Sequence, residues 1–364
     1  MTISRPDAWP LECPDGVSEE AMALLAASEV VDLHLDTFIV HRLTGLDMTK
    51  RHGIGPLGGR LFGHLDFPTA VASGLTGGMW SITTNPFRPA SSRWRTLQDN
   101  IRAYRAQIAA AQGKVRIASN MAEWRQARAA GAHVVLPAIQ GGNAVQAAPE
   151  GIASLPSGFF TRITLVHLTN AVYGPTSSPF SLGFGKKARL TDAGRTLVEQ
   201  MNAARIFVDL AHIGEQAFWD AVAHHDKGQP LIVTHTGVEG VRPHWRNLTD
   251  DQLRAVADTG GVIGIMFQVD FLRRPGGPRD VDMVLEHLEH VIAVAGEDAV
   301  AFGSDYDGAI IPPPDLRDGF APARLVDAML RRGWSDTRIQ KALGLNFLRS
   351  FEALRPGSAA VPQA

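Results

Sequence analysis

Residues 30–36 read VVDLHLD, an apolar run that closes on His34 and Asp36. Its valines and leucines, preceded by a helix-like segment, predict a buried β-strand. Strand side chains alternate with period two, so His34 and Asp36 point to the same side. A single His-x-Asp pair is weak evidence for a bound metal. Whether this pair binds a metal therefore depends on the residues at the ends of the other strands.

Apolar runs of the same kind recur along the chain and alternate with helix-like segments. They are apolar on both sides, which is typical of parallel strands buried on both faces. We predict strands at residues 30–36, 78–82, 133–139, 160–167, 206–210, 231–234, 261–267 and 299–303, and helices at 18–29, 97–111, 191–204 and 215–224. Eight such strands in one chain favour a TIM-type (β/α)8 barrel over a doubly wound sheet.

The composition is that of a water-soluble globular protein. Of the 364 residues, 45% are hydrophobic and 20% are charged, which suffices to bury a full core. A net charge of −2 gives no electrostatic reason to expect nucleic acid or an anionic membrane as a partner. No apolar run reaches the roughly 18 residues of a membrane helix, and the N-terminus lacks a secretory pattern. The single cysteine, Cys13, fits a reducing compartment, so we expect a cytoplasmic protein.

The chain is predicted to form one domain. We expect residues 1–19 to be an N-terminal extension, 20–355 a single (β/α)8 metallohydrolase-like domain and 356–364 a disordered tail. The Pro/Ser/Gly-rich stretch 174–187 is interpreted as a long loop over the catalytic face, which in a barrel lies at the carboxyl ends of the strands. Thr249 and Gln252 form a capping box that predicts the start of a helix.

The ends of four apolar runs gather residue types that hydrolytic metal sites use. His34 and Asp36 end the first run, while His212 and His235 end two later ones. Imidazole and carboxylate together suit Zn²⁺. Asp305 ends the last run and can orient or deprotonate a water, or hold a substrate ammonium. Each residue can also be a hydrogen-bonded group of the core, but their joint placement on strand ends favours a metal site.

A series of ordered motifs resembles the membrane (renal) dipeptidases of the amidohydrolase superfamily over about residues 20–350. The motifs are DLHLD (32–36), ITLVH (163–167) followed by Asn170, LTDAGR (190–195), VDLAH (208–212), THT (234–236), RNLTD (246–250) and GSDYDG (303–308). The resemblance implies a distorted amidohydrolase-like barrel that holds two zinc ions. It also implies hydrolysis of the amide bond of a dipeptide or dipeptide-like small molecule by metal-activated water.

The resemblance implies which residues hold the metals. One zinc ion would be bound through His34 and Asp36, and the other through His212 and His235. A glutamate bridges the two ions in the family, where the pattern Glu-Gly-Gly stands against QGG from Gln140 here. Two divalent cations about 3.5 Å apart repel by on the order of 20 kcal/mol at an effective dielectric of about 20. An amide carries no charge to offset this, so Gln140 is a doubtful ligand and predicts a weakened or lost second zinc.

The same resemblance assigns the substrate-binding and catalytic residues. His167 would face the scissile carbonyl or its oxyanion, Arg246 the substrate carboxylate, and Asp305 the amino end and the proton transfer. Their chemistry agrees, because an arginine fork binds a carboxylate in bidentate fashion and a histidine donor stabilises an oxyanion. The resemblance also makes a homodimer plausible.

Gln140 leaves three functions open. The first is a zinc-dependent dipeptidase-like hydrolase. The second is a one-metal or metal-free family member that runs a different reaction on an amino-acid-like substrate in a specialised biosynthetic pathway. The third is a non-catalytic homologue that binds a small molecule. A second His-x-Asp pair, His64 and Asp66, is not interpreted as a metal site, because Asp66 stands where a helix starts. Asp307 could face the same mouth as Asp305 or serve a structural hydrogen bond.

Overall fold

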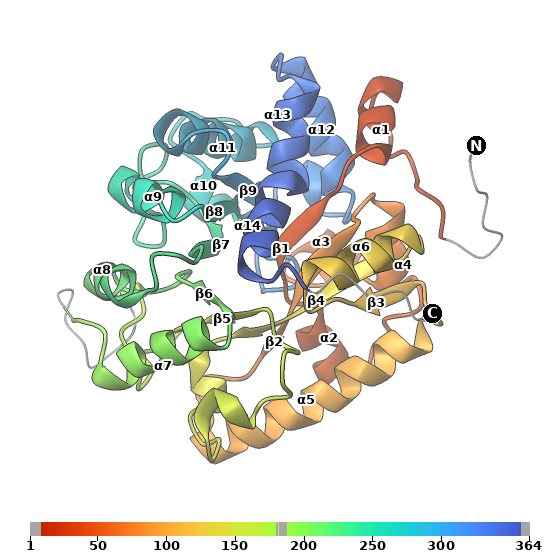
Figure 1. Cartoon of the computed structure of the whole chain (residues 1–364). Helices are drawn as coiled ribbons and strands as arrows, with labels where there is room; N and C mark the ends of the chain where they lie inside the picture. The colour runs from red at the N-terminus through yellow and green to blue at the C-terminus, as the bar shows by residue number, and fades with distance from the viewer. Residues whose placement is uncertain (1–8, 180, 182–187, 358–364) are drawn as a thin grey trace.

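A computed structural model of the chain describes residues 9–179, 181 and 188–357. Parallel strands form a sheet that curls into a barrel, with helices arranged around it (Figure 1). In order around the sheet, the strands are β1 (Val31–Leu35), β2 (Gly77–Thr83), β4 (His133–Gln140), β5 (Arg162–Thr164), β6 (Phe207–Asp209), β7 (Ile232–Thr236), β8 (Val262–Ile265) and β9 (Val300–Phe302). The predicted distorted (β/α)8 barrel is confirmed.

Closure of the barrel brings the last strand against the first. The backbone N–H of Asp305 donates to the carbonyl of His34 (3.1 Å), and that of Asp36 donates to Tyr306 (2.9 Å). The barrel is irregular elsewhere, since β6 and β7 pair only at Asp209 and Ile232. The closing bonds set two candidate site residues, His34 and Asp305, side by side.

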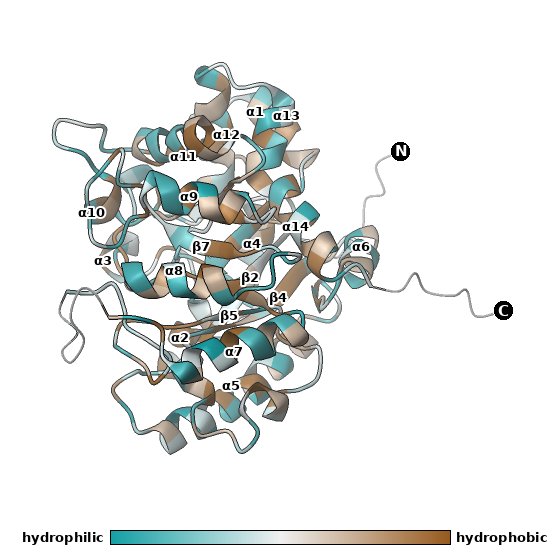
Figure 2. Ribbon diagram, turned by 60° about the vertical axis from the view of Figure 1, so that its left-hand side comes forward, coloured by the Kyte–Doolittle hydropathy of each residue, from teal (hydrophilic) through white to brown (hydrophobic). Residues whose placement is uncertain are grey.

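Helices cover the outside of the strands, as Figure 2 shows by its apolar strands behind partly hydrophilic helices. The helices are α1 (Glu19–Ala26), α2 (Thr37–Thr44), α3 (Pro56–Gly59), α4 (Phe67–Ala72), α5 (Ala90–Ala110), α6 (Met121–Ala129), α7 (Asp192–Ala203), α8 (Glu215–His224), α9 (Asp250–Ala257), α10 (Val269–Leu272), α11 (Asp282–Ala295), α12 (Ala321–Arg331), α13 (Asp336–Gln340) and α14 (Asn346–Leu354). Among the described residues, none of these helices is long and apolar enough to cross a bilayer.

Most predicted elements lie where the sequence placed them. The capping box of Thr249 and Gln252 starts α9, and the predicted helix 215–224 is α8. The short strand β3 (Val115–Ile117), which pairs with β4 outside the closed path, was not predicted. Residues 180 and 182–187 of the predicted loop, and residues 358–364 of the predicted tail, lie outside the described residues. The domain boundaries stay predictions.

Two strands slip in register near their carboxyl ends, and the slip in β7 redirects a histidine. The pairing of β1 shifts between Asp32 and Leu35, and that of β7 shifts between Val233 and Thr236. In a regular strand, neighbours such as Thr234 and His235 would point to opposite faces. Here both reach the barrel interior, since the Thr234 hydroxyl donates to Asp209 and the His235 ring lies 3.9 Å from that of His34. The slip in β7 therefore brings two neighbouring polar side chains to one end of the barrel.

Candidate active site

The candidate site residues meet at the carboxyl ends of the strands. A cavity of about 330 Å³ opens there, and its polar lining includes Asp36, Gln140, His167, His212, Arg246 and Asp305. Apolar side chains, among them Phe62, Met266 and Phe271, form the remaining wall. His34 and His235 do not line the cavity and are fully buried. All eight residues named by the sequence therefore gather at one mouth.

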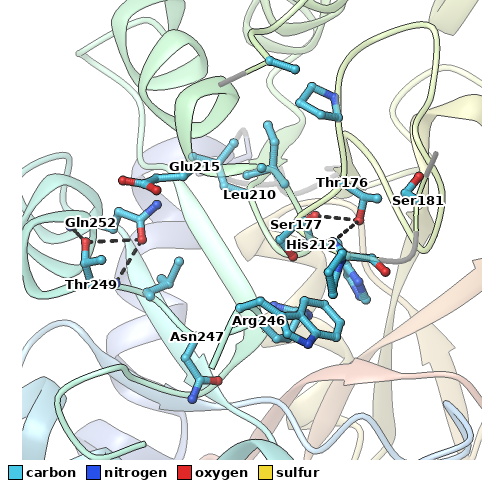
Figure 3. A pocket seen from close by; sticks show the side chains of 18 of the residues that line it. Thr176, Ser177, Ser181, Leu210, His212, Glu215, Arg246, Asn247, Thr249 and Gln252 are labelled. Carbon is cyan, nitrogen blue, oxygen red and sulfur yellow. Dashed lines mark hydrogen bonds between the residues drawn. The ribbon is translucent and has the colours of Figure 1, made fainter. Parts of the chain in front are cut away.

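A second cavity of about 530 Å³ adjoins the first. The two share His212 and Arg246, together with Ser178 and Trp245. Figure 3 shows this second cavity, in which the labelled side chains of Arg246 and His212 lie on the side opposite Glu215. Arg246 thus stands between a small cavity at the strand ends and a larger one beyond it.

One half of the site contains His34, Asp36 and Gln140. His34 Nε2 lies 3.6 Å from Asp36 Oδ2 and 3.6 Å from Asp305 Oδ1. The Gln140 amide takes the orientation that its hydrogen-bond partners require. Its Nε2 donates to Asp36 Oδ2 (2.8 Å), and its Oε1 accepts from His34 Nε2 (3.3 Å) and His167 Nε2 (3.2 Å). In this orientation the Gln140 amide forms hydrogen bonds with Asp36, His34 and His167.

The other half contains His212 and His235. Their Nε2 atoms lie 2.8 Å apart, so a proton or a cation must lie between the two nitrogens. The Thr234 hydroxyl donates to Asp209 Oδ2 (2.8 Å), which leaves its oxygen to accept from His235 Nδ1 (2.8 Å). His235 then carries its proton on Nδ1 and a lone pair on Nε2, which is the arrangement of metal-binding histidines.

This second donor set fits a divalent metal. Ligand atoms of His34, His235 and Asp305 lie within 4.8 Å of one another, and His212 contacts His235. Two imidazoles and a carboxylate are a usual ligand set for catalytic zinc, which keeps a further position open. By distance alone the set is His34, His235 and Asp305, with His212 joined to it through His235. Whether His34 is a ligand also depends on the hydrogen bond to its other ring nitrogen.

Burial governs the ionisation of the site. Desolvation lowers the pKa of His167 to about 4 and the pKa values of His212 and His235 well below the ordinary value, so all three rings are neutral near pH 7. Desolvation also raises the pKa of the Asp305 carboxyl well above its ordinary value, and the charge of Asp36 raises it further. A carboxyl with a raised pKa can hold and transfer a proton at neutral pH.

Two site residues have strained backbone. His212 has φ +65° and Asp305 has φ +62°, the left-handed region that non-glycine residues rarely adopt. Such a conformation costs on the order of 1–3 kcal/mol and persists where the surroundings hold it, most often at functional sites. These angles aim two of the candidate ligands at the cavity.

Arg246 and His167 retain unpaired polar atoms. Arg246 Nη2 donates to the carbonyl of His235 (2.8 Å), and its buried Nε has no partner among the described residues. His167 Nδ1 is likewise buried without a partner among them. Buried polar atoms are nearly always hydrogen-bonded, so these orphans are expected to face a bound molecule or water.

The chain matches the family model of the membrane dipeptidases, peptidase family M19, over residues 18–361. The chain belongs to the membrane dipeptidase family. Two solved structures are similar to it. The dipeptidase AC, a metallo peptidase of family M19, is 28% identical with a TM-score of 0.79, and the match covers 91% of this chain and 99% of that one. A metallo peptidase from Rhodobacter sphaeroides is 27% identical with a TM-score of 0.77, covering 90% and 99%.

A curated relative resembles only part of this membrane dipeptidase family member. An uncharacterized protein in the pqqA 5′ region of Klebsiella pneumoniae is 42% identical over 164 residues. The match covers 44% of this chain and about three fifths (59%) of the relative. Family membership implies a hydrolase of the dipeptidase type with a metal cofactor. The identity of the metal, the cytoplasmic location and the homodimer stay predictions.

The second His-x-Asp pair has a structural role, as the sequence indicated for Asp66. Asp66 caps α4 by accepting from the N–H of Thr69 (2.7 Å). His64 is buried, and its Nδ1 lies 3.1 Å from Asp307 Oδ1. Asp307 also accepts from the Thr37 hydroxyl (2.6 Å), so it ties α2 to the loop after β9 instead of facing substrate.

The sequence interpretation missed the residues that lie behind the histidine rings. Thr234 and Asp209 belong to the motifs THT and VDLAH, but the motifs alone indicate no role for either. Arg162 was not singled out, although it is a charged residue inside a predicted apolar strand. It is fully buried in β5 and contacts His34. An arginine at an interior strand position was the available signal, because buried charges need partners.

Proposed function

We propose that this protein is a zinc-dependent dipeptidase-like hydrolase that works with a single metal ion. The observation that carries the proposal is that His212, Asp305 and Arg246 line one cavity, while the buried His235 lies behind them within reach of His212 and Asp305. His212, His235 and Asp305 would hold the metal. When bound, zinc supplies Lewis acidity for a carbonyl and lowers the pKa of a nearby water. Gln140 supports one ion over two, because it brings no charge to offset a second.

The side chains around the metal site have separate roles in the proposed reaction. Asp305 moves the proton from the attacking water to the leaving amine. His167 Nε2, which lies 3.2 Å from the Gln140 amide, turns to the oxygen of the scissile carbonyl. Arg246 binds the substrate carboxylate through its guanidinium, whose buried Nε has no partner among the described residues.

The proposed substrate is a dipeptide or a close analogue with a free amine and a free carboxylate. The cavity of about 330 Å³ suits a small molecule, and the adjoining one leaves room beyond Arg246 for a C-terminal side chain. The similar protein from Rhodobacter sphaeroides was solved with a phosphinate mimic of the dipeptide L-Ala-D-Ala. That ligand supports a dipeptide as the class of substrate.

Metal analysis together with a substrate panel tests this function. We expect purified protein to hold about one zinc and to cleave dipeptides, but not the same dipeptides acetylated at the amine or amidated at the carboxylate. Chelation should abolish turnover, and added zinc should restore it. Protein that holds no metal and gains no activity from added metal would contradict the proposal.

Gln140 favours a second candidate, a one-metal enzyme that runs another reaction on an amino-acid-like substrate. Its signature would be about one tightly bound metal with no turnover of any dipeptide in the panel. A non-catalytic binding protein would instead hold ligand unchanged, and Asp305→Asn would leave that binding intact. The same panel, read by mass spectrometry, separates these cases.

A further inference from the structure

A fully buried arginine lies beneath the His34 half of the site. The hydrogens of Arg162 Nη2 point to Ser81 Oγ (2.8 Å) and to His34 Nδ1 (2.9 Å). Its Nη1 donates to Thr164 Oγ1 (2.6 Å) and lies 3.5 Å from Asp209 Oδ2. A buried guanidinium needs such partners, because removing it from water costs several kcal/mol. His34 is one of these partners.

The contact with Arg162 fixes the proton of His34. A guanidinium has only donors and stays protonated, so His34 Nδ1 must present its lone pair to Arg162. The ring proton of His34 then lies on Nε2. Acceptors surround that atom, namely Gln140 Oε1 at 3.3 Å and carboxylate oxygens of Asp36 and Asp305 at 3.6 Å. A metal needs a lone pair where His34 carries a hydrogen, so His34 does not fit as a ligand.

Gln140 completes the same pattern. Its amide N–H donates to Asp36, and its carbonyl accepts from His34. The donors and acceptors therefore run in one direction, from Arg162 through His34 and Gln140 to Asp36. A glutamate at position 140 would face the Asp36 carboxylate and would need a cation between the two. The amide and the arginine together satisfy this half without one.

We propose that Arg162 is a positioning residue that takes the place of a metal ion in the His34 half, holding His34 as a hydrogen-bond donor. Arg162 supplies the fixed positive charge, and His34 Nε2–H supplies the contact to Asp36 and Asp305. The inference rests on the proposed function in one respect: the single zinc is held by the half that contains His212 and His235. His34 thus directs its Nε2–H toward the Asp305 carboxyl (3.6 Å) and binds no metal.

The wild-type protein allows a direct test of the His34 proton. In zinc-loaded protein labelled with ¹⁵N-histidine, long-range ¹H–¹⁵N correlations identify the protonated nitrogen of each ring. Comparison with the spectra of His34→Gln and His235→Gln assigns the two rings. We expect the proton on Nε2 in His34 and on Nδ1 in His235. A proton on Nδ1 of His34 would overturn the inference, even if the protein hydrolyses dipeptides.

Metal counting in variants gives a second test. Gln140→Glu should still hold about one zinc after desalting, because Arg162 keeps the lone pair of His34 occupied. Gln140→Glu combined with Arg162→Met should approach two, since Ser81 Oγ, 3.5 Å from His34 Nδ1, can then accept a proton from that nitrogen. The matched control, Gln140→Glu with Arg162→Lys, keeps a buried cationic donor and should stay near one.

The outcomes of these tests are distinct. Two zinc ions in Gln140→Glu alone, or one in a folded Gln140→Glu/Arg162→Met protein, would overturn the role of Arg162. If the double variant fails to fold, as judged by circular dichroism, the wild-type spectrum decides. Absence of metal from wild-type protein would refute the proposed function, while the position of the His34 proton would still test the inference.

Discussion

The two halves of the site carry the same ring chemistry and differ in what lies behind each ring. His235 has a threonine hydroxyl behind it, which accepts the Nδ1 proton and frees Nε2. His34 has a guanidinium behind it, which takes the Nδ1 lone pair and leaves the proton on Nε2. The His235 half is therefore suited to a metal cation, whereas the His34 half already contains the guanidinium cation of Arg162. The atom facing away from the cavity decides whether a histidine can bind metal.

Removing one histidine from each half should separate them most strongly. We expect the zinc affinity of His235→Gln to fall by more than 10- to 100-fold, the loss that follows removal of a residue that only hydrogen-bonds to a metal ligand. Hydrolysis should be lost with the zinc. His34→Gln should retain about one zinc and lose activity through poorer orientation of Asp305. Equal metal loss in the two variants, measured by chelator competition, would contradict the difference between the halves.

The groups behind the rings give a finer version of the same test. Thr234→Val keeps the shape of the side chain but removes the acceptor of the His235 proton. Zinc affinity should fall by about 10- to 100-fold. Ser81→Ala removes a hydroxyl of the other half and is the matched control, with zinc affinity unchanged. A lower zinc affinity in both variants would show that the side chains behind both rings, and not the position of the His235 proton alone, control metal binding.

Arg246 tests whether substrate binds beside the metal-suited half. Its Nη2 already donates to the carbonyl of His235, so a carboxylate bound by the remaining donors would lie near that metal. Arg246→Lys keeps the charge and loses the fork, and we expect kcat/KM for dipeptides to fall about tenfold. The zinc content should not change. A variant with unchanged kcat/KM would place the substrate carboxylate elsewhere.

A pH effect should act on variants of both halves alike. Burial lowers the pKa values of His133 and His287 from 6.5 to about 4, so the folded chain keeps both rings neutral. Below pH 6.5 the unfolded chain binds protons that the folded chain does not, and stability is lost as pH falls toward 4. Urea unfolding at pH 7 and 5.5 measures this loss. His133→Gln should reduce the difference, and no difference in wild-type protein would contradict it.

The sequence predicted the barrel and the strand-end candidates that meet at its mouth because both depend on local patterns, while His167 and Arg246 were assigned through the family resemblance and stay predictions as site residues. Strand alternation and the polar residue closing each run identified His34, His212, His235 and Asp305 as candidates, and Gln140 stood out as a neutral residue among them. The register slips could not be predicted from the sequence, because they are set by the pairing between strands. The position of the proton on the His34 ring could not be predicted either, because its partner Arg162 lies 128 positions away and contacts it only in the folded barrel.

Arg162 also has a consequence for how the barrel closes during folding. Its partners belong to five strands, since His34, Ser81, Ile139, Thr164 and Asp209 come from β1, β2, β4, β5 and β6. A partly closed barrel leaves the guanidinium without some of them, and water then stabilises the open form. The charge becomes well solvated by protein only when all five strands have docked. Closure of this part of the barrel is therefore expected to be a concerted step.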